Sequence, residues 1–418
     1  MRKILLASSA LVGVAMLAAP AFAGDLTVKL SGYDTAMLGQ FSESEHVDPV
    51  LLTPNARNNI GMENLFDINV SVEGKGSNNL DYGAMISLWN GPSYSNNWGT
   101  NNVAFVAGGA KVAGAGTGQF SSTSATEQQA YIWMSNNWGK LMLGDAHGAT
   151  DLFVYAPTVG SNQIDGYYQQ FLDLNKVWRA QPTFIDNNES STRITYYTPK
   201  VSGFQGGISY APDLYSQGLN NNSVSGTVVG VSNVYDNQVE GALAWAGSYD
   251  KFNFKVSGLA TTAQGNQDVT FAGLPPVVDY LSLGLGGQAS YAGFTLGASY
   301  TDPGHYGEVK GQGKQQYMAT VGGKYDWNQA AFAINFEDGE GYNPFWAAGL
   351  PGGALKPGLG AADVDYVRNY MAVGFGATYT WFPGLVSGVD VVLFNQAGPT
   401  AAGDDNGEVV LLSQRVNF

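Results

Sequence analysis

Hydrophobic and polar positions alternate with period two along most of this chain. In segment 281–291, Leu281, Leu283 and Leu285 share one face, while Ser282 and Gln288 lie on the other with several glycines. The same alternation occurs in segments 252–258, 294–300 and 410–418. Strict alternation predicts half-exposed β-strands. One apolar face and one small or polar face is typical of a β-barrel with lipid outside and water inside.

The connections between these strands alternate between short and long. Short connections occur near residues 75–79, 137–139, 199–203, 248–251, 292–293, 326–328 and 381–385. Long segments rich in Gly, Asn, Ser, Pro and Asp occupy about 43–64, 91–125, 145–190, 213–237, 264–280, 303–314, 338–365 and 396–407. Seven short turns and eight long loops join sixteen strands, so we expect an antiparallel barrel of about that number. Aromatic residues such as Tyr249, Trp327 and Trp381 cluster beside the short turns, as in interfacial girdles.

The first residues indicate the compartment. Arg2 and Lys3 precede an apolar stretch that ends near Leu17, and the small-residue sequence 21–23 follows it. This order is typical of a cleaved signal peptide. We therefore expect residues 1–23 to be removed, leaving a barrel domain of 418 − 23 = 395 residues over 24–418.

Composition narrows the class of protein further. Loss of the two basic residues of the leader leaves 19 − 2 = 17 basic against 34 acidic residues, a net charge of −17, and the chain has no Cys. This charge argues against nucleic acid as a partner, since phosphate backbones are bound by clustered Lys and Arg. No stretch beyond the leader approaches the roughly 20 apolar residues that a spanning helix needs. A membrane location would therefore require a closed barrel.

Three local motifs resemble a known family. The chain ends in Arg415-Val416-Asn417-Phe418, segment 193–205 has the pattern of a hairpin, and segment 138–145 precedes a long loop. Together with the leader, these motifs resemble Gram-negative general-diffusion porins. The resemblance implies a sixteen-stranded, homotrimeric barrel in the outer membrane with one pore per subunit. Small hydrophilic solutes and ions would diffuse passively through each pore, narrowed by a third loop folded into the lumen.

The resemblance also implies a constriction with acidic groups on the loop and basic groups on the wall, because charged rings set selectivity at close quarters. By position the third loop is about 145–190, and its acidic candidates are Asp151, Asp165 and Asp173. For the wall we expect Arg193, Lys29 and Arg57. Arg193 alternates with Ile194, and Lys29 lies between two apolar residues, which directs both inward if their neighbours face lipid. The net acidity predicts a weak preference for cations.

Other chemistries have little support. The three histidines, His46, His147 and His305, fall in or beside long loops, and none has a metal-ligand partner at helical spacing. We therefore expect no catalytic residues and no metal required for function. Segment 404–408 offers oxygen ligands for Ca²⁺, and divalent ions can also bridge acidic loops to lipopolysaccharide.

Three alternatives remain open from the residues. A channel selective for a sugar or phosphate would show a lumen track of aromatic residues or a ring of Arg, and its solute would block it. An outer-membrane barrel without transport, whether an enzyme or an anchor, would not conduct. A secreted, lectin-like sandwich would stay soluble without detergent.

Overall fold

The chain forms a barrel of sixteen strands in the computed structural model, which describes residues 26–43, 59–90, 126–160, 168, 171, 191–213, 235–265, 278–306, 308, 316–342, 367–397 and 405–418. The strands are β1 Thr27–Glu43, β2 Ile60–Lys75, β3 Asp81–Trp89, β4 Thr126–Asn136, β5 Gly139–Ala146, β6 Ser191–Tyr197, β7 Phe204–Asp213, β8 Tyr235–Tyr249, β9 Phe252–Gly265, β10 Tyr280–Tyr291, β11 Phe294–Asp302, β12 Tyr317–Trp327, β13 Ala330–Tyr342, β14 Val367–Phe382, β15 Leu385–Ala397 and β16 Asp405–Asn417. Two short 3₁₀ turns, η1 Ser77–Asn79 and η3 Ala149–Leu152, lie between strands.

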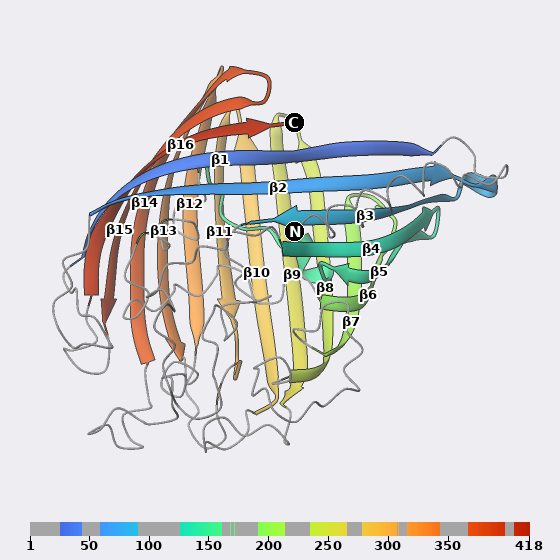
Figure 1. Cartoon of the computed structure of the whole chain (residues 1–418). Coiled ribbons are helices and arrows are strands. Elements are labelled where there is room, and N and C mark those ends of the chain that lie inside the picture. The colour runs from blue at the N-terminus through green and yellow to red at the C-terminus, as the bar shows by residue number, and fades with distance from the viewer. Residues whose placement is uncertain are drawn as a thin grey trace, which may run out of the picture.

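Every strand pairs with its neighbour in sequence, and β1 pairs with β16 to close the barrel. All sixteen pairings are antiparallel, so the predicted fold, its strand number and its alternation of short turns with long connections are confirmed. Figure 1 shows the first and last strands side by side at the closure. A closed antiparallel barrel leaves no strand edge unpaired, which is what a lipid environment demands of a sheet.

The last residue completes the closure. Gly32 N donates to Phe418 O at 2.9 Å, and Phe418 N donates to Gly32 O at 3.0 Å. Gly32 has φ +156°, and a Cβ at this position would lie 2.0 Å from the carbonyl oxygen of Asp67 on β2. A side chain here would therefore separate β1 from β2 at the point where β16 joins, so closure requires glycine.

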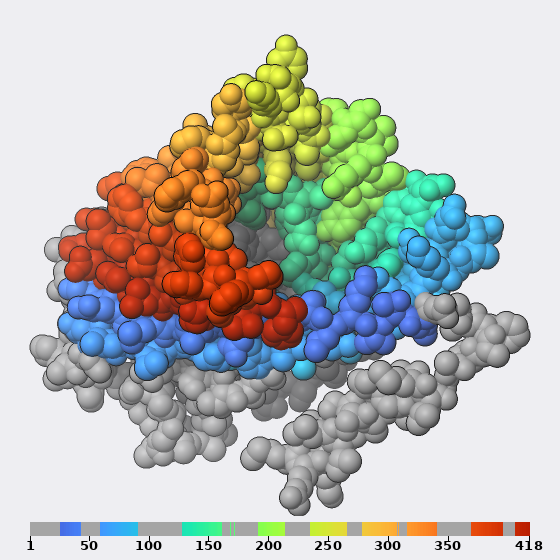
Figure 2. Space-filling model, turned by 90° about the horizontal axis from the view of Figure 1, so that it is seen from above, coloured from blue at the N-terminus to red at the C-terminus, as the bar shows by residue number. Residues whose placement is uncertain are grey.

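The burial pattern is the reverse of that in a soluble protein. Leu281, Leu283 and Leu285 are 55, 48 and 62% exposed on the outside of β10, whereas Ser282 between them is 1% exposed. Aromatic residues beside the short turns, such as Tyr249 and Trp381, are also exposed. Apolar side chains facing out and polar side chains facing in define a barrel that lies in lipid around a polar lumen. Figure 2 looks down on this ring and shows its hollowed centre.

In the described part of the chain, no helix has the length and apolar character needed to cross a membrane.

Candidate functional site

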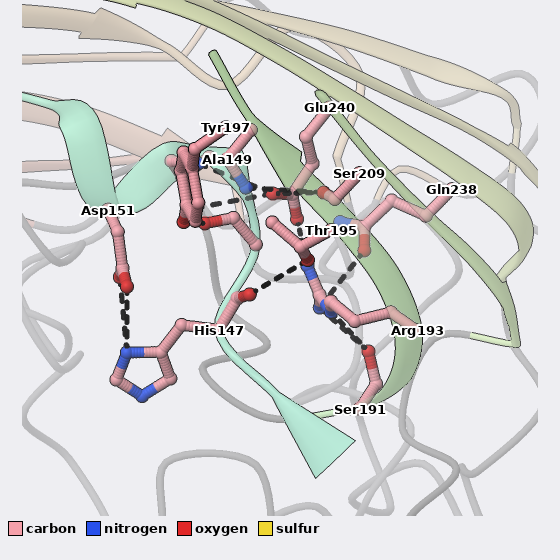
Figure 3. Close-up of polar contacts among 12 residues, drawn as sticks. His147, Ala149, Asp151, Ser191, Arg193, Thr195, Tyr197, Ser209, Gln238 and Glu240 are labelled. Atoms are coloured by element: carbon pink, nitrogen blue, oxygen red, sulfur yellow. Dashed lines mark hydrogen bonds and ion pairs between the residues drawn. The ribbon is translucent and has the colours of Figure 1, made fainter. Parts of the chain in front are cut away.

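The connection between β5 and β6 turns into the barrel immediately after β5. Its first residues form η3, which lies against the inner faces of β6, β7 and β8 (Figure 3). Ala149 N donates to Ser209 Oγ at 3.2 Å. Tyr197 OH donates to Gly148 O at 2.7 Å, and Thr195 Oγ1 donates to His147 O at 3.0 Å. These bonds fix the base of the third loop on the wall, in the inward position that the family resemblance implies.

A buried ion pair lies beneath this base. Arg193 Nη1 donates to Glu240 Oε1 at 2.5 Å, and the two side chains are 0 and 1% exposed. Arg193 also donates from Nε and Nη2 to Ser191 Oγ at 3.0 and 2.7 Å, and Ser209 Oγ donates to Glu240 Oε2 at 2.9 Å. A buried pair needs such additional hydrogen bonds because both charges lose their hydration. The pair is therefore well satisfied, and it is shielded from the water of the lumen.

The loop approaches this pair through a glycine. A Cβ on Gly148 would lie 1.7 Å from Glu240 Oε2 and 2.2 Å from Arg193 Nη1. Just beyond it, Thr150 donates to Glu240 from its backbone N at 3.4 Å and from Oγ1 at 3.5 Å. Glu240 thus accepts hydrogen bonds both from the wall and from the loop, so it connects the two.

The far part of the loop reaches the opposite side of the barrel. Tyr168 and Phe171 are buried in an apolar cluster on the inner faces of β1, β2, β14, β15 and β16, whose other members are Met37, Phe41, Leu65, Tyr370, Ala372, Val392, Phe394, Val409 and Leu411. The hydroxyl groups of Tyr168 and Tyr370 are hydrogen-bonded to each other. The loop is therefore attached to the inner wall at two places, at its base through η3 and on the far side through Tyr168 and Phe171.

Asp151 is the predicted loop acid that the structure places in the lumen. Its side chain is 51% exposed, and its Oδ1 lies 3.1 Å from His147 Nδ1. It interacts electrostatically with Lys140, which lies on the inner face of β5. The Lys140 ammonium lies over the ring of Trp133, 5.3 Å from its centroid. Sequence reasoning missed Lys140, although the alternation of Lys140 with Leu141 places it inward by the test applied to Arg193.

The other predicted residues divide into two groups. Lys29 faces inward on β1, close to the short-turn end, and its Nζ lies 2.5 Å from Glu73 Oε2. Arg57, Asp165 and Asp173 lie outside the described residues. The structure thus places Asp151 within electrostatic range of Lys140, and it places Arg193 under the base of the loop.

Metal-ligating residues show no comparable arrangement. Within the described ranges, no group of three or more His, Cys, Asp or Glu residues has a geometry that could hold a metal ion.

Fold and lumen together define an outer-membrane barrel of the porin class, with a loop folded into its channel. The chain matches the family model for Gram-negative porins over residues 7–399. It therefore belongs to the Gram-negative porin family, whose members form diffusion channels in the outer membrane and are commonly oligomeric.

Similar solved structures share the barrel. An anion-selective porin from Comamonas acidovorans is 13% identical, with a TM-score of 0.57 over 94% of this chain and 100% of that one. OmpT of Vibrio cholerae is 9% identical, with a TM-score of 0.54 over 94% of this chain and 98% of that one. At these identities the likeness concerns the fold alone.

Curated relatives match a shorter part of the chain. An uncharacterised protein of Rickettsia bellii is 28% identical over 160 residues, which is 32% of this chain and 36% of that protein. A protein of Rickettsia conorii is 29% identical over 119 residues. The match with R. bellii spans about a third of each chain.

Proposed function

We propose that this barrel lets small hydrophilic solutes and ions cross the outer membrane by passive diffusion, through the space that the inward loop leaves open. The observation that carries the proposal is the polar inner face together with an inward loop that is attached to the wall at its base and again at Tyr168 and Phe171. Such a loop narrows the lumen without needing to move, so the channel stays open at rest. No bond is made or broken in this function, and no catalytic residue is required.

Asp151 and Lys140 are the charged groups to which we assign the field in the narrow part of the lumen. They project from the loop and from the wall respectively, so a polar solute passing between them would orient its dipole along the line that joins them. An apolar solute has no dipole to align with this field, so it gains no electrostatic stabilisation there. Further candidates for charged groups of the constriction are Asp165 and Asp173 on the loop and Arg57 and Lys29 on the wall.

A weak preference for cations is part of this proposal. The charge of Arg193 is balanced by Glu240 at 2.5 Å, and that of Lys29 by Glu73 at the same distance. Asp151, although it lies near His147 and Lys140, is half exposed to the lumen and so presents accessible negative charge there. The anion selectivity named for the Comamonas porin does not carry over, because lumen charges rather than the fold decide selectivity.

We also propose a homotrimer, and one feature of the outer surface supports it. Asp34 and Asn64 lie on the outside of β1 and β2, where Asn64 Nδ2 donates to Asp34 Oδ1 at 2.5 Å. A carboxylate facing lipid is destabilising, so contact with another subunit is the better environment for it. Chemical crosslinking in detergent should give a trimer, and a monomer under all mild conditions would contradict this proposal.

Two weaker proposals concern the outer loops. Acidic loops bridged by divalent ions would contact lipopolysaccharide, and segment 404–408, of which residues 405–408 begin β16, is our candidate for Ca²⁺. Neither is needed for diffusion. Addition of a chelator to the purified protein should therefore leave solute flux unchanged.

A swelling assay on liposomes that contain the purified protein tests the diffusion proposal. We expect swelling rates to fall smoothly as the size of uncharged sugars increases. A rate that is high for one solute and absent for others of equal size would instead indicate a substrate-selective channel.

A further inference from the structure

The loop continues beyond η3 along the inner wall, and we call residues 153–160 the strap. Its backbone is held by two wall side chains. Val154 N donates to Ser257 Oγ on β9 at 2.7 Å, and Gln288 Nε2 on β10 donates to Tyr155 O at 2.7 Å. The strap therefore passes over successive strands and is bonded to the wall rather than suspended in the lumen.

Glycines occupy the wall where the strap passes closest. A Cβ on Gly286 of β10 would lie 1.8 Å from Val154 O. A Cβ on Gly297 of β11 would lie 2.8 Å from Gln288 Cγ on the wall and 2.9 Å from Pro157 Cδ on the strap. One on Gly322 of β12 would lie 1.7 Å from Asn335 Oδ1 on the wall and 3.2 Å from Pro157 O on the strap. Gly297 and Gly322 are paired directly across β11 and β12. We call Gly286, Gly297 and Gly322 the glycine seat.

The seat faces the lumen and not the lipid. Gly286 is followed in β10 by Gly287 and preceded by Leu285, which is 62% exposed on the outer face. Gly297 likewise follows Leu296, which is 67% exposed outside. On the outer face, Gly241 of β8 has open space around it, because a Cβ there would meet nothing within 4 Å. At Gly286 the close approach is to the backbone of the strap, at Val154 O, whereas Gly241 offers a position on the outer face without such a neighbour.

We propose that the glycine seat sets the bore of the pore, because it lets the strap lie flat against β10, β11 and β12. Gly286, Gly297 and Gly322 are thus positioning residues for the constriction. A methyl group on Gly286 would require Val154 O to withdraw by roughly 1.5 Å to reach an ordinary contact distance. The strap has the wall behind it and the lumen in front, so it moves into the channel and narrows it.

This inference rests on the proposed diffusion function, and single-channel recording of the purified full-length protein tests both. Gly286→Ala should conduct less than the wild type, and Gly286→Val less again. The flux of a trisaccharide should fall by a larger factor than the KCl conductance, because narrowing affects large solutes most. Gly241→Ala, the matched control on the outer face, should behave as the wild type.

The outcomes separate the two proposals. A wild-type protein that does not conduct overturns the diffusion function itself. Suppose that the wild type conducts and that Gly286→Ala folds. If the variant then has the wild-type conductance and the wild-type ratio of trisaccharide flux to KCl conductance, the proposal that the glycine seat sets the bore is overturned. Folding is checked by the change in gel mobility on heating. If Gly286→Ala does not fold, Gly297→Ala serves in its place and has the same two outcomes, since its Cβ would meet the flexible side chain of Gln288 at 2.8 Å and Pro157 Cδ at 2.9 Å.

Discussion

Arg193 and Glu240 form an ion pair with 2.5 Å between Nη1 and Oε1, inside the barrel and out of contact with solvent. The pair joins β6 to β8, and its carboxylate also accepts hydrogen bonds from the backbone and side chain of Thr150 in the inward loop. The role of this ion pair is therefore to hold the base of the loop. Its contribution to the stability of the barrel depends on both partners being present.

Removal of one partner should be costly. Glu240→Ala leaves the guanidinium of Arg193 buried without its carboxylate, and breaking a buried pair in this way costs about 3–5 kcal/mol. We expect a loss of that size in the free energy of unfolding, measured by urea titration in lipid vesicles, together with noisier single-channel currents. The double variant Arg193→Met/Glu240→Leu should recover most of the stability. If the single and double variants were equally unstable, the pair would not act as described.

Charge changes at Asp151 and Lys140 should shift ion selectivity in opposite directions. Asp151→Asn removes a lumen anion and should lower the cation preference, while Lys140→Gln should raise it. Both shifts should shrink at high salt, since screening acts over about 10 Å at 0.1 M and 3 Å at 1 M. The measurement is the reversal potential in a KCl gradient. Asp250→Asn, in a short turn with φ +53° that Asn tolerates, is the control and should leave selectivity unchanged.

The far attachment of the loop depends on Phe171. The Phe171 side chain is 5% exposed in the apolar cluster. It packs so closely against β1 that a Cβ added to Gly39 would lie 2.5 Å from its ring. Large-to-small changes of a buried Phe cost about 3–5 kcal/mol. Phe171→Ala should therefore release this end of the loop and produce frequent transitions between current levels, whereas Tyr370→Phe removes only one hydroxyl and should have a smaller effect. Steady currents in Phe171→Ala would show that the loop is held elsewhere.

Barrel closure should be sensitive to Gly32. Gly32→Val places a branched side chain against the carbonyl of Asp67, at the position where Gly32 pairs with Phe418. We expect this variant to fail to assemble, seen as the absence of a heat-modifiable band on gels of outer membranes. Gly241→Ala should assemble normally. Normal assembly of Gly32→Val would mean that this pairing is dispensable.

The fold could be predicted from the sequence because its signals are local. Alternation in segments such as 281–291 sets the faces, and Gly- and Asn-rich connections separate the strands, so sixteen strands could be counted correctly. The inward direction of Arg193 follows from the same alternation. The leader of residues 1–23 lies outside the described residues and stays a prediction.

The arrangement of the lumen could not be predicted, because it depends on contacts between residues far apart in sequence. Glu240 is 47 positions from Arg193, so nothing local indicated that this arginine would be neutralised and covered. Ser257 is 103 positions from Val154, so the path of the strap was equally hidden. The alternation of Lys140 with Leu141 indicates that Lys140 faces the lumen. Its link to the constriction could be seen only from the position of Asp151 in the loop.

Recording in planar lipid bilayers tests the central claim most directly. The detergent-extracted wild-type protein should produce stepwise increases in current, with a conductance that rises in proportion to salt concentration and with a reversal potential of cationic sign in a KCl gradient. A protein that inserts without any conductance steps, or whose small conductance saturates and is blocked by one solute, would contradict a general diffusion pore.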